Sequence, residues 1–550
     1  MNGVNPILPG FYPDPSICRV DNDYYLITSS FSFFPGIPIF HSIDLVNWEQ
    51  IGHVLERPSQ LNLDGGSYSS GIFAPTIRYN NHKYYVITTN MTYGGNFIVH
   101  AESPYGPWSD PIWLDAPGID PSLFFDDDGR AYVTGTRTKS NARYFGDHEI
   151  WIQELDLNSL ALIGDRKALW DGAMKNAMFV EAPHLYKKEG YYYLMISEGG
   201  TEQYHSITVA RSDTIMGDYA SHPANPILTH RHLGKHFPIT NVGHGDLVET
   251  PTGSWYMVAL GCRPCNDTIN LGRETFITDV IWEDGWPLVA SGKGIIECNP
   301  TAINQLAEKV TSNYFLDNFE QDNLDKQWNV IRTPHKIFWQ CNSQNKCLEL
   351  NLKPQTLLER LTLPSFEHKK VSQNIEPVDD CPAFIGRRIQ DHSYSVTCQM
   401  FFDPNNHSEE AGIAIVQESN HQFRFFVSGN KEKLTLTLVK CHSERQANFA
   451  ESSFSYENIE QTLACKTIEH KPTQLKIYVN QNQYSFAFSQ DGILFQPLVE
   501  NIDSQFLGTE AAGGFVGNYI GMYATSNGHS SSNRARFDFF EYKPNSINTL

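Results

Sequence analysis

Apolar and polar residues alternate with a period of two through most of the chain, in short runs separated by Gly, Pro, Asn and Asp. Such alternation is typical of β-strands that bury one face. Five runs in the first half of the chain are rich in tyrosine and predict equivalent strands of a repeat. They are DYYLITSS from Asp23, KYYVITTN from Lys83, RAYVTGTR from Arg130, YYYLMISE from Tyr191 and SWYMVALG from Ser254. The pattern predicts an all-β fold.

A short motif precedes each tyrosine-rich strand, and most copies pair a small or acidic residue with proline. The copies are Asp14-Pro15-Ser16-Ile17, Ala74-Pro75-Thr76-Ile77, Asp120-Pro121-Ser122-Leu123, Glu181-Ala182-Pro183-His184-Leu185 and His244-Gly245-Asp246-Leu247. Repeats of roughly 50 to 60 residues, each with room for about four strands, are typical of β-propeller blades. We therefore expect a five-bladed β-propeller over residues 1–300. A β-sandwich could supply evenly spaced strands, but it would not explain the repeated motif.

The rhythm of the sequence changes near residue 300. Thr301–Lys309 (TAINQLAEK) predicts a short helix or linker, and we place a linker over residues 301–314. Alternating runs such as YSVTCQMFF (Tyr394–Phe402), QFRFFVSG (Gln422–Gly429) and QLKIYVNQ (Gln474–Gln481) then predict further strands. They indicate a second domain over residues 315–550, a β-sandwich of jelly-roll or concanavalin-like type.

The predicted propeller brings residues from distant motifs together, because equivalent positions of successive blades converge on one axis. Asp14, Asp120, Glu181 and His244 would then share one site. Two carboxyl groups across a small pocket are the minimum for glycoside hydrolysis, since one must be protonated and the other ionised. A single Asp before proline more often caps a turn. Three acids in register favour a catalytic site.

Charge and composition narrow the class of partner. The chain carries 62 acidic and 41 basic side chains, a formal net charge of −21, which disfavours nucleic acid, anionic membranes and polyanionic substrates. The sequence contains no apolar stretch of about 18 residues, so it predicts no membrane-spanning helix. The N-terminal residues lack the features of a secretory signal, so we expect a cytoplasmic protein. The ten cysteines lack a disulfide-framework spacing, and the single CxxC pair, Cys262 and Cys265, is insufficient for a zinc site.

Several motifs together resemble glycoside hydrolase family 43. They are PGFYPDPSICRVDNDYYLITSS, FAPTIRYNNHKYYVITT, IDPSLFFDDDGRAYV, EAPHLYKKEGYYYLMISEGGT and LGRETF, and the resemblance covers essentially the whole chain. It is closest to the β-xylosidase and α-L-arabinofuranosidase branch, whose members carry a C-terminal β-sandwich. The resemblance implies hydrolysis by single displacement with inversion. It places the general base on Asp14, the general acid on Glu181, and the acid that tunes this pair on Asp120. Inversion requires the acid and base to lie roughly 6.5–9.5 Å apart.

The resemblance also implies a set of substrate-binding residues. Arg273 of LGRETF would contact sugar hydroxyls and the catalytic carboxylates, with a surface salt bridge as its alternative, and Arg263 of GCRP is a second candidate. Phe515 of the C-terminal domain would close the pocket, or else it packs in the sandwich core. The remaining wall residues are Phe31, Phe73, Ala74 and Ile119. Relatives often carry Trp or Tyr at the position of Phe73, which leaves the sugar preference open.

His244 matches a histidine that the family places near the propeller axis. The resemblance implies that it contributes to sugar binding and could hold a structural calcium ion through water, with no cofactor required for the reaction. A hydrogen-bonded core histidine is the alternative.

These observations favour an exo-acting, inverting xylan 1,4-β-xylosidase that acts on xylo- or arabinoxylo-oligosaccharides. α-L-Arabinofuranosidase activity is a companion or the main alternative, because one pocket can accept both sugars. An endo-arabinanase would need an open groove, and a non-catalytic carbohydrate-binding propeller would not need all three acids. Monomer and homo-oligomer both remain open.

Overall fold

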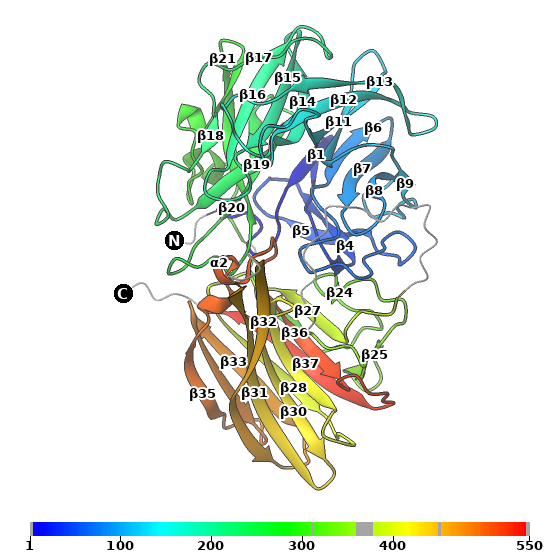
Figure 1. Ribbon diagram of the computed structural model, residues 1–550, viewed down its shortest axis with the longest axis vertical. Coiled ribbons are helices and arrows are strands. Elements are labelled where there is room, and N and C mark those ends of the chain that lie inside the picture. The colour runs from blue at the N-terminus through cyan, green and yellow to red at the C-terminus, as the bar shows by residue number, and fades with distance from the viewer. Residues whose placement is uncertain (1–3, 311, 359–377, 449–452, 546–550) are drawn as a thin grey trace.

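Antiparallel β-sheets make up nearly all of the regular structure, which confirms the predicted all-β class (Figure 1). The computed structural model describes residues 4–310, 312–358, 378–448 and 453–545. Within these ranges the helical segments are α1 (Thr301–Asn304), α2 (Thr509–Ala512) and the 3₁₀ turns η1 (Ala290–Gly292) and η2 (Gln505–Leu507). No helix of the described residues is long and apolar enough to cross a membrane.

Five antiparallel sheets follow one another along the first part of the chain, and each tyrosine-rich run forms the second strand of a sheet. Sheet one contains β1 (Ser16–Val20), β2 (Asp23–Ile27), β4 (Gly36–Ser42) and β5 (Glu49–Leu55). Sheet two contains β6 (Thr76–Asn80), β7 (Lys83–Asn90), β8 (Gly95–Ala101) and β9 (Ile112–Trp113). Sheet three contains β10 (Ile119–Phe125), β11 (Ala131–Thr138), β12 (His148–Asp156) and β13 (Ala161–Trp170). Sheet four contains β14 (Glu181–Lys188), β15 (Tyr191–Glu198), β16 (Ser206–Ser212), β17 (Ala220–Ser221) and β18 (Leu228–Thr229). Sheet five contains β19 (Thr240–Glu249), β20 (Trp255–Cys262), β21 (Glu274–Glu283) and β22 (Trp286–Val289).

The first strands of the five sheets contact one another in a closed ring. β1 lies against β6 and β19, β6 lies against β10, β10 lies against β14, and β14 lies against β19. We call this part of the molecule the five-sheet domain. Because each motif identified in the sequence overlaps one of these strands, the ring brings all five motifs together.

Apolar side chains fill the spaces between neighbouring sheets of the ring. Trp151 packs in a cluster with Ile87 of sheet two, whereas the next residue, Ile152, packs with Leu194 of sheet four. Consecutive residues of a strand point to opposite faces, so both faces of β12 are buried. Burial of each such side chain stabilises the fold by about 1.5–3 kcal/mol. The core of the five-sheet domain is therefore divided among several inter-sheet clusters.

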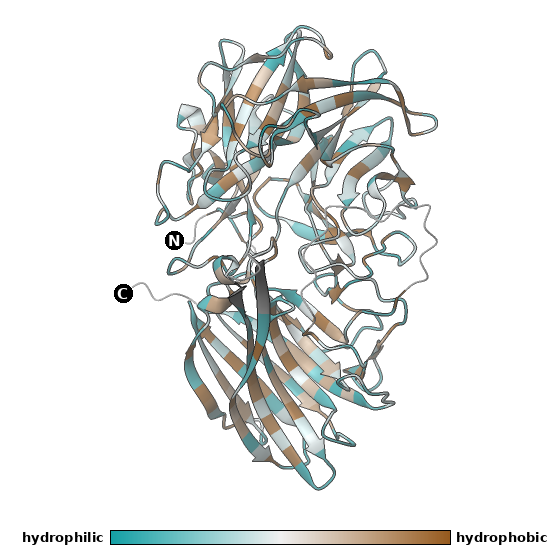
Figure 2. Ribbon diagram, viewed as in Figure 1, coloured by the Kyte–Doolittle hydropathy of each residue, from teal (hydrophilic) through white to brown (hydrophobic). Residues whose placement is uncertain are grey.

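Two larger sheets form the C-terminal domain, and their inner faces pack on each other. The first has the order β25 (Trp339–Asn342), β26 (Cys347–Asn351), β37 (Arg534–Pro544), β28 (Ser393–Phe401), β33 (Thr473–Asn480), β34 (Gln483–Ser489) and β35 (Gln496–Asp503), with β23 (Phe315–Asp317) also paired to β37. The second has the order β27 (Phe384–Arg388), β36 (Tyr519–Thr525), β29 (Glu410–Glu418), β30 (His421–Asn430), β31 (Lys433–Asn448) and β32 (Ser453–Ile468). Leu475 and Ile477 of the first sheet share a buried cluster with Phe425 of the second. The alternating colours along these strands in Figure 2 show the same period-two pattern.

The segment between the two domains is fixed at several points. β22 ends at Val289 and β23 begins at Phe315, and the predicted linker contains α1. The Lys309 ammonium donates to the carbonyl of Val4 over 3.1 Å. This contact ties the connecting segment to the N-terminal part of the chain.

The C-terminal domain contacts the five-sheet domain through one short antiparallel pair of strands. β24 (Val330–Ile331) pairs with β3 (Phe33–Phe34). Arg388 lies buried between the domains, and its Nε donates to the carbonyl of Phe11 over 2.6 Å. The segments that carry Phe31 and Asp14 are therefore held by both domains.

Candidate active site

Four residues with left-handed backbone conformations mark equivalent points of four strands in the ring. The φ angles are 55° at Asp14, 52° at Asp120, 52° at Ala182 and 45° at His244. A positive φ is uncommon for residues other than glycine and is concentrated at functional sites. The equivalent residue of the fourth motif is thus Ala182, and Glu181 precedes it. The ladders of β10 and β14 shift register here, and this bulge re-aims the side chains.

Asp14 is a buried carboxylate with three polar neighbours. Ser29 Oγ donates to Asp14 Oδ2 over 2.5 Å, and Arg273 Nη1 donates to Asp14 Oδ1 over 2.9 Å. His244 Nδ1 lies 3.6 Å from the same Oδ1. Burial alone would raise the pKa of Asp14, but Arg273, with His244 and Ser29, brings it below its ordinary value. Because burial lowers the pKa of His244, Arg273 supplies the positive charge at neutral pH, and Asp14 is ionised.

Glu181 and Asp120 have the opposite electrostatic situation. Burial and the nearby carboxylates of Asp120 and Asp14 raise the pKa of Glu181 well above its ordinary value. Burial and the Asp14 charge also raise the pKa of Asp120, although the backbone N–H of Ala182 donates to its Oδ2 over 3.2 Å. We call Asp14, Asp120 and Glu181 the acid cluster. It can hold a proton on Glu181 while Asp14 remains ionised.

Arg273 connects the acid cluster to the C-terminal domain. Its Nη1 also donates to Thr201 Oγ1 over 3.2 Å, and its Nη2 donates to the carbonyl of Phe515 over 3.5 Å. The guanidinium carbon lies 5.5 Å from the ring centroid of Phe31 and 5.8 Å from that of Phe515. A guanidinium held by a carboxylate and by aromatic faces is fixed in orientation.

Three phenylalanines form an aromatic wall beside Arg273. The ring centroids of Phe31 and Phe73 lie 5.1 Å apart, and the centroid of Phe515 lies 6.1 Å from each of them. The backbone N–H of Phe515 donates to Ser69 Oγ over 2.9 Å. Phe515 is therefore held at the domain interface, beside two residues of the five-sheet domain. Flat apolar rings of this kind suit the C–H faces of a sugar.

The other expected wall residues, Ala74 and Ile119, are neighbours in sequence of Phe73 and Asp120. Ala74 is buried next to Phe73, and Ile119 is half-buried and directly precedes Asp120. Ile119 pairs with Thr136 of β11, which hydrogen-bonds to the carbonyl of Val180, the residue before Glu181. The segments that carry Asp120 and Glu181 are thereby linked.

Arg263 does not join this group, which corrects the expectation that it binds substrate. Its Nε and Nη2 donate to the two carboxylate oxygens of Glu274, each over 2.7 Å. Glu274 is fully buried and also accepts from the backbone N–H of Gly10 over 2.8 Å. Arg263 is therefore held in a salt bridge with Glu274.

The residues around His244 do not supply a set of direct side-chain ligands for calcium. Calcium takes six to eight oxygen ligands, which can be carboxylates, carbonyls or waters. Asp14, the carboxylate in contact with His244, is already bound by Arg273, and Asp246 is bound by Arg78. Among the described residues, no group of three or more His, Cys, Asp or Glu side chains is arranged to hold a metal ion.

A cavity of about 560 Å³ adjoins Arg273 and Phe515. Residues of both domains line it, among them Thr201, Gln203, Asn241, Gly513 and Gly514. Its volume is typical of a small-molecule site. The carboxyl groups of the acid cluster do not line it, whereas Arg273, which donates to Asp14, does.

Ser29 and Thr201 contact the central residues of the site but were not predicted from the sequence. Ser29 lies at the end of DYYLITSS, and Thr201 ends the EGGT motif. Both stretches belong to the motifs that resemble glycoside hydrolase family 43. Nothing in their spacing indicates which hydroxyl faces Asp14 or Arg273.

Comparisons with known proteins identify the family of the chain. Residues 4–287 match the model of glycosyl hydrolases family 43, and residues 316–543 match that of the β-xylosidase C-terminal concanavalin A-like domain. The chain belongs to glycosyl hydrolase family 43. The second match also confirms the predicted concanavalin-like class of the C-terminal domain.

Named members of family 43 resemble the chain over almost its full length. A xylosidase/arabinosidase from Butyrivibrio fibrisolvens is 43% identical, over 98% of each chain. A non-reducing end α-L-arabinofuranosidase from Bacteroides ovatus is 32% identical, over 98% of this chain and 94% of the other. The crystal structure of a xylan β-1,4-xylosidase from Bacillus halodurans has a TM-score of 0.83 at 33% identity, over 98% and 99% of the two chains. The chain is a glycoside hydrolase of the xylosidase/arabinosidase group within family 43.

Proposed function

We propose that this family 43 chain is an exo-acting, inverting β-xylosidase that releases terminal xylose from β-1,4-xylo-oligosaccharides and also cleaves terminal α-L-arabinofuranosides. In this interpretation the five-sheet domain is a five-bladed β-propeller, and the acid cluster lies at its axis. The proposal rests on the different protonation of Asp14 and Glu181 described above.

That difference supports assigned roles for the two residues. An inverting reaction needs a base that is already ionised and an acid that still carries its proton at the same pH. Asp14, held by Arg273 and Ser29, suits the base. Glu181, whose pKa is raised by burial and by two carboxylates, suits the acid. Two groups whose environments separate their pKa values are the usual sign of an acid–base pair.

The proposed reaction is one displacement at the anomeric carbon. Asp14 takes a proton from a water molecule as the water oxygen bonds to that carbon. Glu181 gives its proton to the glycosidic oxygen as the bond between this oxygen and the anomeric carbon breaks. Asp120 keeps the pKa of Glu181 high, and Arg273 orients Asp14 and the sugar. After the products leave, Asp14 releases to solvent the proton that it took from water, and Glu181 regains a proton from solvent.

The position of Phe515 supports cleavage at a chain end. This residue comes from the C-terminal domain, yet its ring belongs to the aromatic wall with Phe31 and Phe73. A wall contributed by the second domain closes one side of the sugar site, which an endo-acting enzyme would need to keep open. We therefore propose that one terminal sugar enters at a time.

α-L-Arabinofuranosidase as the main activity is the second candidate. It is favoured by the names of the relatives from Butyrivibrio fibrisolvens and Bacteroides ovatus. Phe73 offers an apolar ring and no polar group to distinguish the two sugars. A small difference in sugar shape is worth only about 1–3 kcal/mol in an apolar pocket, so both activities can coexist.

A parallel rate comparison tests the proposal. We expect kcat/KM on an aryl β-D-xylopyranoside to exceed that on the corresponding aryl α-L-arabinofuranoside, with measurable turnover of both and of xylobiose. Proton NMR of the first-formed xylose should show the α-anomer, because inversion of a β-linkage gives α-xylose. The Glu181→Gln variant serves as the inactive control in the xylobiose assay.

Each alternative has its own outcome. A higher kcat/KM on the arabinofuranoside would make that activity the main one. First-formed β-xylose would exclude inversion. Xylose binding without turnover of either substrate would indicate a non-catalytic carbohydrate-binding protein.

A further inference from the structure

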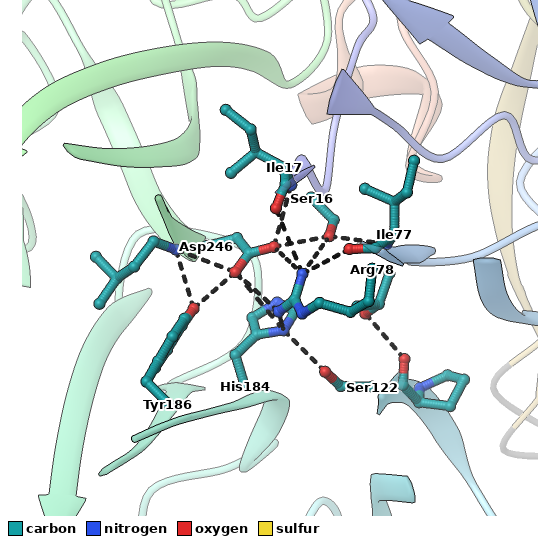
Figure 3. A network of polar contacts seen from close by, with 11 residues as sticks. Ser16, Ile17, Ile77, Arg78, Ser122, His184, Tyr186 and Asp246 are labelled. Atoms are coloured by element: carbon teal, nitrogen blue, oxygen red, sulfur yellow. Dashed lines mark hydrogen bonds and ion pairs between the residues drawn. The ribbon is translucent and has the colours of Figure 1, made fainter. Parts of the chain in front are cut away.

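A second layer of polar side chains lies on the first strands of the ring. Several of its members follow residues of the acid cluster closely in sequence. Each of the five strands contributes to it, and we call the set the axial network (Figure 3). Its members are Ser16 of β1, Arg78 of β6, Ser122 of β10, His184 and Tyr186 of β14, and Asp246 of β19. Figure 3 shows the guanidinium of Arg78 at the centre of these contacts.

Arg78 and Asp246 form the core of the axial network. Arg78 Nη1 donates to Asp246 Oδ2 over 2.8 Å, and Arg78 Nη2 donates to Asp246 Oδ1 over 3.0 Å. Paired contacts of this kind fix orientation as well as distance. Asp246 also accepts from Ser16 Oγ over 2.7 Å and from Tyr186 OH over 2.7 Å. The carboxylate is fully buried, so each of its hydrogen bonds is made with protein groups.

His184 extends the network to the third sheet. Arg78 Nη2 donates to His184 Nδ1 over 3.1 Å, and Ser122 Oγ lies 3.0 Å from the same nitrogen. A guanidinium can only donate, so Nδ1 must accept, and the ring proton lies on Nε2. His184 is therefore neutral and cannot replace the charge of Arg78.

The axial network and the acid cluster share the same short segments of chain. Ser16 follows Asp14 by two positions, and Ser122 follows Asp120 by two positions. His184 follows Glu181 by three positions, and the bulge at Ala182 takes up the extra residue. A shift in Ser16, Ser122 or His184 therefore moves the carboxyl group two or three positions upstream of it.

We propose that Arg78 serves as the chain's own axial cation and as a positioning residue for the reaction. It joins four of the first strands through Asp246, Ser16 and His184, and the contact of His184 with Ser122 adds the fifth. In this way it fixes the separation of Asp14, Asp120 and Glu181. This role rests on the proposed function of those three acids. It also assigns to a side chain the structural task that a calcium ion at the axis would perform.

The contacts of Arg78 favour positioning over a direct electrostatic effect. The charges that shift the pKa values of Asp14, Asp120 and Glu181 come from one another, from Arg273 and from histidines, and Arg78 is absent from them. Its charge is neutralised by the buried carboxylate of Asp246. Loss of Arg78 should therefore change geometry, and with it kcat, more than sugar binding, which depends on Arg273 and the aromatic wall.

Substitution of Arg78 tests the proposal. In Arg78→Met we expect kcat on an aryl β-xyloside to fall on the order of 10²-fold, since misplacement by about 1 Å has effects of this size. KM should stay within about threefold, because ground-state binding is retained. Millimolar guanidinium chloride should restore part of kcat by occupying the vacated position. All rates are compared well below the melting temperature of each variant.

Arg19→Met is the matched control. Arg19 also joins sheet one to sheet five, because its Nε donates to the carbonyl of Glu249 on β19, but this contact is exposed and lies outside the network. We expect its kcat to equal that of the wild type. Arg78→Lys covers the case in which Arg78→Met does not fold. Lysine keeps the charge but not the paired contacts, so kcat should fall about tenfold while the protein remains folded.

Several results would overturn the role of Arg78. They are wild-type kcat in a folded Arg78→Met or Arg78→Lys variant, an equal loss of kcat in Arg19→Met, and a rise in KM alone. An increase of both kcat and melting temperature on adding calcium to the wild type would give the axial role to a metal ion. These outcomes leave the proposed hydrolase function intact, whereas wild-type activity of Glu181→Gln on xylobiose would remove the acid role on which that function rests.

Discussion

The acid cluster and the axial network lie on the same five strands, yet their charges are balanced in opposite ways. In the acid cluster three carboxyl groups share one guanidinium, that of Arg273. In the axial network one carboxylate, Asp246, faces one guanidinium, that of Arg78. The first arrangement retains a proton because all three acids cannot ionise together. The second is fully ionised and rigid.

The difference shows how one repeated backbone can separate chemistry from support. A buried charge must be paired or protonated. Among Asp14, Asp120 and Glu181, protonation avoids an unpaired buried charge, and it leaves a proton available for transfer. Two or three residues further along, pairing supplies the solution, and no group titrates near neutral pH. The acid cluster can therefore supply a proton because its negative charges are not fully paired, whereas the charges of the neighbouring axial network are.

The largest expected effect is the loss of the proton donor. Glu181→Gln should lower kcat on xylobiose by about 10²–10⁴-fold, because the leaving sugar oxygen needs a proton. The loss should be much smaller on an aryl xyloside with an activated leaving group, which departs without protonation. Steady-state kinetics on the two substrates measures this difference.

Asp14→Asn provides the matched comparison within the acid cluster. Its loss should be similar on both substrates, because activation of water does not depend on the leaving group. Equal losses for Glu181→Gln on the two substrates would assign the acid role to another residue.

The sequence predicted the acid cluster because its signal is local and repeated. Asp14 and Asp120 stand before proline in copies of one motif, and closure of a ring brings such positions together. The displaced position of Glu181 was visible as well, although the bulge that turns its side chain was not. Phe515 and Arg273 were found through resemblance to a family, since nothing in their spacing indicates contact with residues far away in the chain.

Arg78 and Arg263 show where sequence reasoning reaches its limit. Both are arginines in strand-like surroundings, and their partners, Asp246 and Glu274, are chosen by the closed fold. Arg263 was assigned to the substrate and Arg78 was not singled out. The serines of the repeated Pro-Ser motif carried a usable signal, because Ser16 and Ser122 are both buried members of the axial network.

Substitutions in the axial network and in the acid cluster should change the pH dependence of the free energy of unfolding in opposite directions. Asp246→Asn should lower the free energy of unfolding by about 3–5 kcal/mol at neutral pH, because Arg78 loses its counter-charge. Burial opposes ionisation of Asp246, but Arg78 holds its pKa below the ordinary value of 3.8. The pair therefore stabilises the fold above that value, and the difference between variant and wild type should shrink as pH falls below it.

Glu181→Gln should show the reverse trend. The folded-state pKa of Glu181 is raised, so the wild type loses stability as pH rises from the ordinary value of 4.5 toward the folded value. Glutamine removes that loss, and the variant should become more stable than the wild type as pH increases. Urea unfolding of both variants over the same pH series tests the contrast. Parallel curves would mean that the two layers do not differ in charge balance.

The smallest expected effect separates the two causes of the raised pKa of Glu181. Asp120→Asn removes a neighbouring negative charge, so the pKa of Glu181 should fall and the acid should lose its proton at lower pH. The alkaline limb of the kcat/KM profile on xylobiose should move about one to two pH units downward. The acidic limb depends on Asp14 and should move little.

Asp126→Asn is the control for this substitution. Asp126 directly follows β10, but it is paired with Lys187 over 2.6 Å at the other end of the strand from Asp120. The alkaline limb of this variant should match that of the wild type. If the limb also stays in place in Asp120→Asn, burial alone keeps Glu181 protonated. The unbalanced charge of the acid cluster would then contribute to binding or geometry but not to the supply of the proton.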